Sequence, residues 1–207
     1  QLDGDVFRYD AEGLRVEVRP ASGAWIRYVY DPTGTTLRLL EEYVSDNHTD
    51  WVLRARYVHG LGLISRIDGL NATKLYHYDL RGSTVALTAL GSTTPSDTYA
   101  YDPYGRVTKQ SMIVNPFTYN GRDGVMDDGN GLYFMRTRYY APELMRFIQK
   151  DQKFSGTLDD PQSLNRYAYV KGDPIRFTDP NGEKWSWWDT LASVFTVVGI
   201  VVAVVAL

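Results

Sequence analysis

The chain has 207 residues, which is enough for one large domain or two small ones. It carries 22 Lys and Arg against 25 Asp and Glu, and a net charge of −3 gives no basis for a nucleic-acid partner. Because there is no Cys, disulfides do not hold the protein together. The 16 Tyr and 18 Gly form a mixture that suits strands and tight turns.

A five-residue word, Tyr-Asp-X-X-Gly, occurs four times in the first half of the chain. We expect a strand to end at each Tyr, the Asp to start a turn, and the Gly to supply a positive φ. The word starts 21 residues apart at 9 and 30, and 23 apart at 78 and 101. A repeat of roughly 20 residues favours a stacked or spiralling architecture of β-hairpins over four chance turns in an ordinary β protein. Its members are Tyr9, Asp10, Gly13, Tyr30, Asp31, Gly34, Tyr78, Asp79, Gly82, Tyr101, Asp102 and Gly105.

Residues 1–114 form this repeat region, and alternating or β-rich runs in it predict strands. After the first turn, Leu14–Val18 alternates apolar and polar residues as a half-buried strand does. Further strands are predicted over Trp25–Tyr30, Leu37–Val44, Val52–Val58, Leu63–Asp68, Lys74–Tyr78, Val85–Leu90, Asp97–Tyr101 and Val107–Gln110. The scattered Arg residues are expected to stack on Tyr or pair with acidic side chains.

The pattern changes at Asn115. Residues 115–182 are rich in aromatic residues and turns, do not repeat, and therefore behave like a cap on the repeats. Within this segment Leu164–Val170 is expected to form a short helix. Residues 183–207 would begin a separate C-terminal region.

Several short words follow one another in the segment 115–182. They are Gly131-Leu-Tyr, Arg138-Tyr-Tyr-Ala-Pro-Glu, Arg146-Phe, Asn165-Arg-Tyr-Ala-Tyr, Asp173-Pro-Ile and Asp179-Pro-Asn-Gly. In these words and their order the segment resembles the Rhs-repeat-associated core, the end of Rhs and YD-repeat proteins, and the upstream Tyr-Asp words fit the same pattern. The family includes Rhs effectors, Tc toxin C subunits, WapA-like wall proteins and teneurins.

The resemblance implies an all-β fold in which antiparallel hairpins spiral into part of a hollow shell. The core segment would plug one end, and the chain beyond it would be a variable toxin in bacterial members. This chain is too short for a whole shell and would supply its last turns and the plug.

In many bacterial members, two Asp-Pro-X-Gly words in the core act like the carboxyl pair of aspartic proteases. They cut the chain just after the second word. The chemistry needs two carboxyls that share one proton, so that one activates water while the other polarises the scissile carbonyl. By this resemblance Asp151 and Asp179 would be the catalytic pair, Arg146 a nearby cation that modulates it, and the cut would fall between Gly182 and Glu183.

The two words depart from the family pattern in three ways. After Asp151, Gln152 replaces the Pro and Lys153-Phe154 replaces the rest of the word. The spacing of 28 residues from 151 to 179 is long, which suggests an insertion over residues 152–162. Members that cut often have Leu after the final Gly, where this chain has Glu183.

Other carboxylates compete for the first role. Asp160 begins an Asp-Pro turn and lies 19 residues before Asp179, and Asp159 and Asp173 are further alternatives. Without the family, such Asp residues are turn formers more often than catalysts. The three His, at positions 48, 59 and 77, lack metal-ligand spacing, so we expect no metal and no cofactor.

Residues 191–207 carry no charge and follow Trp185, Trp187 and Trp188. As a helix they would be about 26 Å long, at the short limit for crossing a hydrocarbon core of about 30 Å. Three interpretations remain: the start of a membrane-active effector, an apolar segment stored against the inside of the shell, and a strand or helix of a larger domain.

We therefore expect the C-terminal part of a shell that houses and presents a C-terminal toxin. Two alternatives remain for its chemistry: the two aspartates cut the chain after the core, or the chain stays whole. Its partners would be the rest of its own shell, the toxin cargo, a delivery system, a cognate immunity protein and, through residues 191–207, a membrane. The protein would be secreted or lie at a bacterial cell surface. The rival hypothesis is a wall-associated adhesion or structural protein of the same repeats that carries no cargo.

Overall fold

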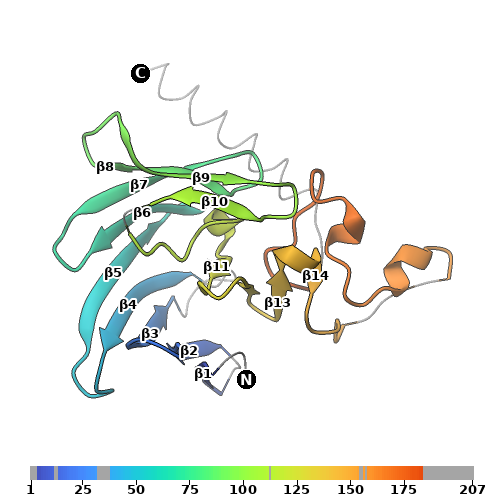
Figure 1. Ribbon diagram of the computed structural model, residues 1–207, viewed down its shortest axis with the longest axis horizontal. Coiled ribbons are helices and arrows are strands. Elements are labelled where there is room, and N and C mark those ends of the chain that lie inside the picture. Colours follow the sequence, from blue (N-terminus) through green and yellow to red (C-terminus); the bar gives the residue numbers. More distant parts are fainter. Residues whose placement is uncertain are drawn as a thin grey trace. The chain divides into compact units, whose positions relative to one another are not determined.

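The computed structural model describes residues 4–11, 14–31, 38–111, 113–153, 156 and 158–183. These residues form antiparallel strands joined by turns, and the only helices among them are short 3₁₀ turns. Ten strands make one sheet in the linear order β1 to β10, so each strand pairs with its neighbours in sequence and the sheet is open (Figure 1). The all-β antiparallel fold expected from the repeats is confirmed.

The strands of this sheet have bounds close to those predicted, and three of them match fully. They are β1 (Val6–Tyr9), β2 (Arg15–Arg19), β3 (Trp25–Tyr30), β4 (Leu39–Ser45), β5 (Val52–His59), β6 (Leu63–Asp68), β7 (Thr73–Tyr78), β8 (Thr84–Ala89), β9 (Pro95–Tyr101) and β10 (Val107–Gln110). Strands β1, β3, β7 and β9 each end at the Tyr of a Tyr-Asp word, as the motif predicts.

After β7 and β9 the turn is built by the Asp side chain. In the last copy, Oδ1 of Asp102 accepts hydrogen bonds from the backbone N–H of Tyr104 at 2.9 Å and of Arg106 at 3.0 Å. The N–H of Gly105 donates to the carbonyl of Asp102 at 3.1 Å, and Gly105 has a φ of +89°. The carboxylate therefore satisfies backbone donors that the tight turn would otherwise leave open. Asp79 makes the same bonds to Arg81 and Ser83.

A fifth copy of this turn lies between β6 and β7. Oδ1 of Asp68 accepts from the N–H of Leu70 and of Ala72, both at 2.9 Å. Asn71 takes the left-handed position with a φ of +65°. Because Asn71 stands where the motif has Gly and Ile67 where it has Tyr, the sequence word is absent although its geometry is kept.

The chain divides into two compact units. The first comprises Gln1–Tyr76 and Leu87–Pro95. Its buried side chains include Tyr28, Leu39, Tyr57, Leu63 and Leu87. Arg15 lies over the rings of Phe7 and Tyr28, which is the stacking role expected for Arg.

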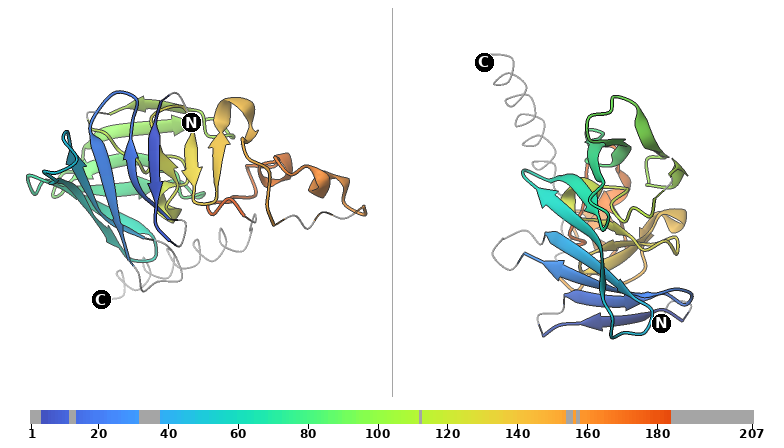
Figure 2. Two further views of the ribbon diagram at one scale, coloured as in Figure 1. Left: turned by 90° about the horizontal axis from the view of Figure 1, so that it is seen from below. Right: turned by 90° about the vertical axis from the view of Figure 1, so that its left-hand side faces the viewer.

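The second unit comprises His77–Ala86 and Ser96–Leu207. It holds a four-stranded antiparallel sheet in the order β11 to β14 (Figure 2). Its strands are β11 (Met126–Asp127), β12 (Tyr133–Met135), β13 (Arg138–Ala141) and β14 (Arg146–Phe147). The 3₁₀ turns are η1 (Gly121–Asp123), η2 (Pro142–Leu144), η3 (Pro161–Leu164) and η4 (Val170–Gly172).

A cluster of aromatic side chains forms the core of the second unit. Its buried members are Tyr119, Val125, Tyr133, Met135, Tyr140, Phe147, Tyr169 and Val170. Rings pack closely within it, and the centroids of Tyr140 and Tyr169 are 4.3 Å apart. Burying such rings supplies much of the stabilisation of a unit that has little regular structure.

The short helix expected over Leu164–Val170 is wrong. Only its first and last residues are helical, as the end of η3 and the start of η4. Between them the chain makes a turn, in which Ala168 N–H donates to Asn165 O. The turn pairs with β14 and the residues after it, because Phe147 N–H donates to Tyr167 O and Asp151 N–H to Arg166 O. Tyr169 is thereby carried into the core. Pairing between distant segments has overridden a local preference.

Among the described residues, no helix is long and apolar enough to cross a membrane. The apolar segment 191–207, for which we expect a short helix or strand, lies outside the described residues.

Candidate functional site

Arg138, at the start of β13, brings the two predicted carboxylates together. Its Nη2 lies 3.4 Å from Oδ2 of Asp151 and 3.4 Å from Oδ2 of Asp179. The two Oδ2 atoms can therefore be no further apart than about twice that length. Residues separated by 28 positions in the chain thus meet at one guanidinium.

Asp151 is fixed by its backbone and by its own turn. Its N–H donates to Arg166 O at 2.9 Å, and the Arg166 guanidinium donates back to Asp151 O through Nε at 3.0 Å. Oδ1 of Asp151 accepts the N–H of Lys153 at 2.8 Å, which leaves Oδ2 for Arg138. Its side chain is 21% exposed, so water can reach this carboxylate.

Asp179 sits in the same kind of turn as the Tyr-Asp words. Its Oδ1 accepts the N–H of Glu183 at 3.1 Å, and the N–H of Gly182 donates to Asp179 O at 3.2 Å. What sets Asp179 apart is burial, since its side chain is only 4% exposed, and the ion pair of Oδ2 with Arg138. A turn-forming Asp has here become half of a buried charge cluster.

The carbonyl of Gly182 is held by two donors. Nε of Arg138 donates to it at 2.5 Å and Oγ1 of Thr137 at 2.8 Å. The Thr137 hydroxyl has one proton, and it shares that proton with the carbonyl of Asn181 at 2.9 Å. This carbonyl belongs to the peptide bond between Gly182 and Glu183, the expected site of cutting. Two donors on one carbonyl oxygen are the arrangement that stabilises an oxyanion during acyl transfer.

The guanidinium of Arg138 is itself packed and buried. It lies 3.7 Å from the centroid of the Phe147 ring, and its Nη1 donates to Arg166 O at 3.2 Å. Burial lowers the pKa of Arg138 from its usual value, and the carboxylates of Asp151 and Asp179 oppose that shift. Because an Arg remains charged in proteins, the site keeps one fixed cation facing two carboxylates.

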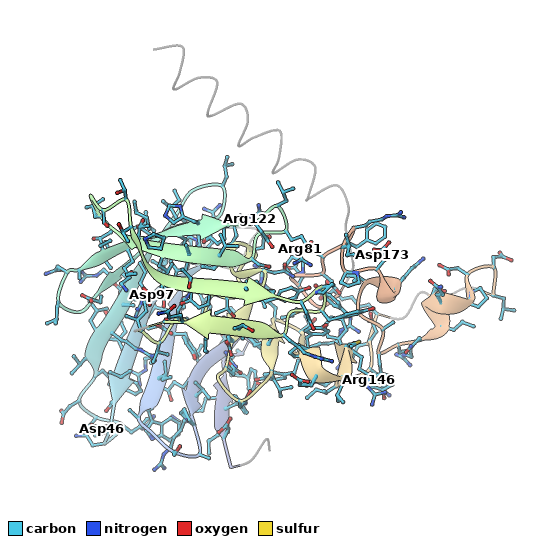
Figure 3. The ribbon with its side chains drawn as sticks, turned by 45° about the horizontal axis from the view of Figure 1, so that its top comes forward. Asp46, Arg81, Asp97, Arg122, Arg146 and Asp173 are labelled. Atoms are coloured by element: carbon cyan, nitrogen blue, oxygen red, sulfur yellow. The ribbon has the colours of Figure 1, made fainter. Side chains whose placement is uncertain are left out.

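The other predicted residues lie elsewhere. Arg146 is exposed on β14, where it bridges to Ala168, so Arg138 and not Arg146 is the cation that the structure places at the carboxylate pair (Figure 3). Asp160 precedes η3 and pairs with Lys171, and its hydrogen bond to Lys171 lowers its pKa. Asp173 pairs with Arg176 at 3.6 Å, and Asp159 is exposed.

Arg138 and Thr137 are not among the site residues predicted from the sequence. A signal was present, because Arg138 stands beside two Tyr in a run with the pattern of a buried strand. A buried Arg requires partners for its charge, and acidic residues elsewhere are the available ones. Within the described ranges no cluster of His, Asp and Glu could hold a metal ion.

Comparison with known proteins finds similarity to large bacterial proteins. The chain is 29% identical over 187 residues to the tRNA nuclease WapA of Bacillus subtilis, covering 87% of this chain and 8% of WapA. It is 35% identical over 85 residues to the toxin subunit YenC2 of Yersinia entomophaga, covering 40% of this chain and 8% of YenC2. An animal protein, salivary gland surface protein 1 of Aedes aegypti, is 30% identical over 193 residues, which are 86% of this chain and 5% of that protein.

Among solved structures, the TcdB2-TccC3-Cdc42 complex matches with a TM-score of 0.63 and 21% identity, over 86% of this chain and 9% of that one. No family model matches the chain. The chain thus spans less than a tenth of the length of these relatives, and the solved structure supports the fold alone. The sequence matches and the shared open antiparallel fold together relate this chain to the Rhs-like and Tc toxin group of proteins.

Proposed function

We propose that this chain is the C-terminal part of an Rhs-repeat shell and that it cuts its own backbone between Gly182 and Glu183. The observation that carries the proposal is the meeting of Asp151, Asp179 and the Gly182 carbonyl at Arg138. Residues 115–182 would be the Rhs-repeat-associated core that closes the shell, and the chain beyond the cut would be toxin cargo.

The positions of the two carboxylates suggest different roles in hydrolysis. Asp151 is the more exposed of the two, so it takes a proton from water, and the resulting hydroxide bonds to the carbonyl carbon of Gly182. Nε of Arg138 and Oγ1 of Thr137 hold the oxygen as it becomes negative.

Asp179 lies against the leaving group, because its Oδ1 accepts the N–H of Glu183. In the reacting form the pair of carboxyls holds one proton, carried by Asp179, and this proton passes to the Glu183 nitrogen when the tetrahedral intermediate has turned the nitrogen lone pair toward the carboxyl and the bond from carbon to nitrogen breaks. The pair begins and ends with one proton, which has moved from Asp179 to Asp151. The products are a new carboxyl group on Gly182 and a new amine on Glu183.

Replacement of either carboxyl tests the proposal. The wild-type chain should give two fragments on denaturing electrophoresis, with the second fragment beginning at Glu183 by N-terminal sequencing. Asp151→Asn and Asp179→Asn should each remain whole, because loss of a general acid or base slows hydrolysis by about 10²- to 10⁴-fold.

Asp173→Asn is the matched control. Asp173 also begins an Asp-Pro turn of the second unit, but it pairs with Arg176 and its side chain is 36% exposed, so its replacement should leave cutting unchanged. A wild-type chain that stays whole would contradict self-cleavage.

The names of the relatives, which include a nuclease and a toxin subunit, support a role in toxin delivery. Under this proposal the protein is secreted, the released segment is the active toxin, and the producing cell carries an immunity protein against it. A second function, a surface protein without cargo, is favoured by the similarity to the Aedes aegypti surface protein. Under that function the chain stays whole, so the same electrophoresis separates the two.

A further inference from the structure

We propose that Lys153 is a positioning residue for the cut, because its ammonium holds the side chain of Glu183, the residue directly after the scissile bond. The inference rests on the self-cleavage proposed above. It adds that Glu183, whose nitrogen is the leaving group, must be held in position. Nζ of Lys153 lies 2.7 Å from Oε1 of Glu183.

The pair connects the two turns that carry the catalytic carboxylates. The backbone N–H of Lys153 donates to Oδ1 of Asp151 at 2.8 Å. The backbone N–H of Glu183 donates to Oδ1 of Asp179 at 3.1 Å. Each member of the ion pair is therefore bonded through its own backbone to one carboxylate, and the contact between their side chains joins the two turns.

The pair also accounts for two departures of this sequence from the family pattern. Lys153 stands in the degraded first word, and Glu183 stands where members that cut often have Leu. The two unusual residues carry opposite charges, and the structure places them in contact.

The expected effect is modest. The side chains of Lys153 and Glu183 are 71% and 37% exposed, and an exposed ion pair changes an equilibrium or a rate by about threefold to fivefold. Such a pair is screened by salt, so its effect should shrink as ionic strength rises. Positioning of the scissile peptide is the step that this contact supports, because a small displacement of reacting atoms slows a reaction.

The test is a charge-reversal cycle on the full chain, in which cutting is followed by electrophoresis after a short labelling pulse in cell-free synthesis. Lys153→Glu and Glu183→Lys should each slow cutting about threefold to fivefold at low salt. The double variant restores the opposite charges in exchanged positions, so its rate should return to within about twofold of wild type. Lys153→Arg, which keeps the charge, should also cut at close to the wild-type rate.

Lys150→Glu is the matched control, since Lys150 is an exposed lysine three residues earlier and has no ion pair among the described residues. It makes the same change of net charge and should leave the rate unchanged. Thermal unfolding of each variant in an Asp179→Asn background measures folding separately from cutting.

The results of this test distinguish the positioning role of Lys153 from the self-cleavage on which it rests. A wild-type chain that stays whole overturns both. A wild-type chain that is cut, together with a Lys153→Glu variant that is cut as fast or faster, overturns the positioning role and leaves self-cleavage standing. Failure of the double variant to recover its rate overturns the positioning role as well.

Discussion

Gly182 shows how closely one residue is fitted to the candidate site. Its φ is +66°, and a Cβ added to it would lie 2.5 Å from the carbonyl oxygen of Met135 and 3.0 Å from Oγ1 of Thr137. A side chain here must push the backbone away from the two donors on its carbonyl. The position therefore needs Gly for its conformation and also for its lack of volume.

We expect Gly182→Ala to slow cutting by at least about tenfold, because a displacement near 1 Å at reacting atoms has an effect of that order or larger. Gly172→Ala is the matched control. Gly172 has a φ of +77°, but nothing lies within 4 Å of the place where its Cβ would be. Backbone strain should cost both variants about 1 kcal/mol of stability, and Gly182→Ala should lose more than this because its Cβ also meets the carbonyl oxygen of Met135. Equal rates of cutting in the two variants would show that the close approach at Gly182 is unimportant.

Glu17 is the acidic residue through which pH should change the stability of the first unit. Its side chain is 7% exposed and accepts bonds from His48 at 3.0 Å, Arg27 at 2.8 Å and Arg8 at 3.2 Å. Burial works to raise the pKa of Glu17, but the hydrogen bonds from His48, Arg27 and Arg8 outweigh it and lower the pKa from 4.5 to about 2.

A depressed pKa stabilises the folded state above the unfolded pKa, and this stabilisation is lost as pH falls through the folded pKa. The window for Glu17 is therefore from about pH 4.5 down to about pH 2. Glu17→Gln should lower the free energy of unfolding by on the order of 2 kcal/mol at pH 7, and the difference from wild type should disappear near pH 2.

Urea unfolding at several pH values measures this difference. Glu41→Gln is the control, because the Glu41–Arg56 pair is more exposed and should contribute less than about 1 kcal/mol. If the difference in free energy of unfolding between Glu17→Gln and wild type stayed constant between pH 4.5 and pH 2, Glu17 would not be the residue whose lowered pKa stabilises the first unit.

At the scale of elements, the Asp turn is the unit from which this fold is built. Asp102 satisfies two backbone donors with one oxygen, so Asp102→Ala should cost about 1–3 kcal/mol. Asp102→Asn keeps the accepting oxygen and should cost clearly less. The free energies of urea unfolding of the two variants test this, and equal losses would show that the charge of Asp102, and not its bonds to the turn, stabilises the element.

Strand ends and turns are predicted correctly where interactions between residues close in sequence determine the backbone conformation. Each Tyr-Asp word marks the end of a strand, because the Asp and Gly act within five residues. A turn after Asp68 is predicted from Gly69, but the Tyr-Asp word does not mark it, because Asn71 supplies the left-handed conformation in place of Gly. The helix expected at 164–170 failed for a different reason, since that segment pairs with residues near Asp151.

The residues of the candidate site also fall into two groups, those that sequence motifs predict and those that they do not. Asp151 and Asp179 could be selected from words of the sequence, and the structure brings them to one guanidinium. Arg138 and Thr137 as donors to Gly182, and Lys153 as the partner of Glu183, could not be selected. Those contacts join positions 30 to 45 residues apart, and no local pattern encodes them.

At the scale of the whole molecule, the candidate bond and the candidate carboxylates belong to the same compact unit of one chain. Gly182 is buried and held by the carbonyl contacts of Thr137 and Arg138, so the bond is already in place when the unit has folded. A second chain would have to displace this segment to present its own bond. Cutting should therefore be intramolecular.

We expect the half-time of cutting to stay constant when the chain is diluted tenfold, because an intramolecular step is first order. We also expect an Asp179→Asn chain, tagged so that its size differs, to remain whole when it is mixed with wild-type chain. Electrophoresis of the mixture measures both species in one lane. Cutting of the tagged chain would show that one chain can cut another. The segment around Gly182 would then have to leave its contacts with Arg138 and Thr137 readily, and cutting would not be restricted to the chain's own bond.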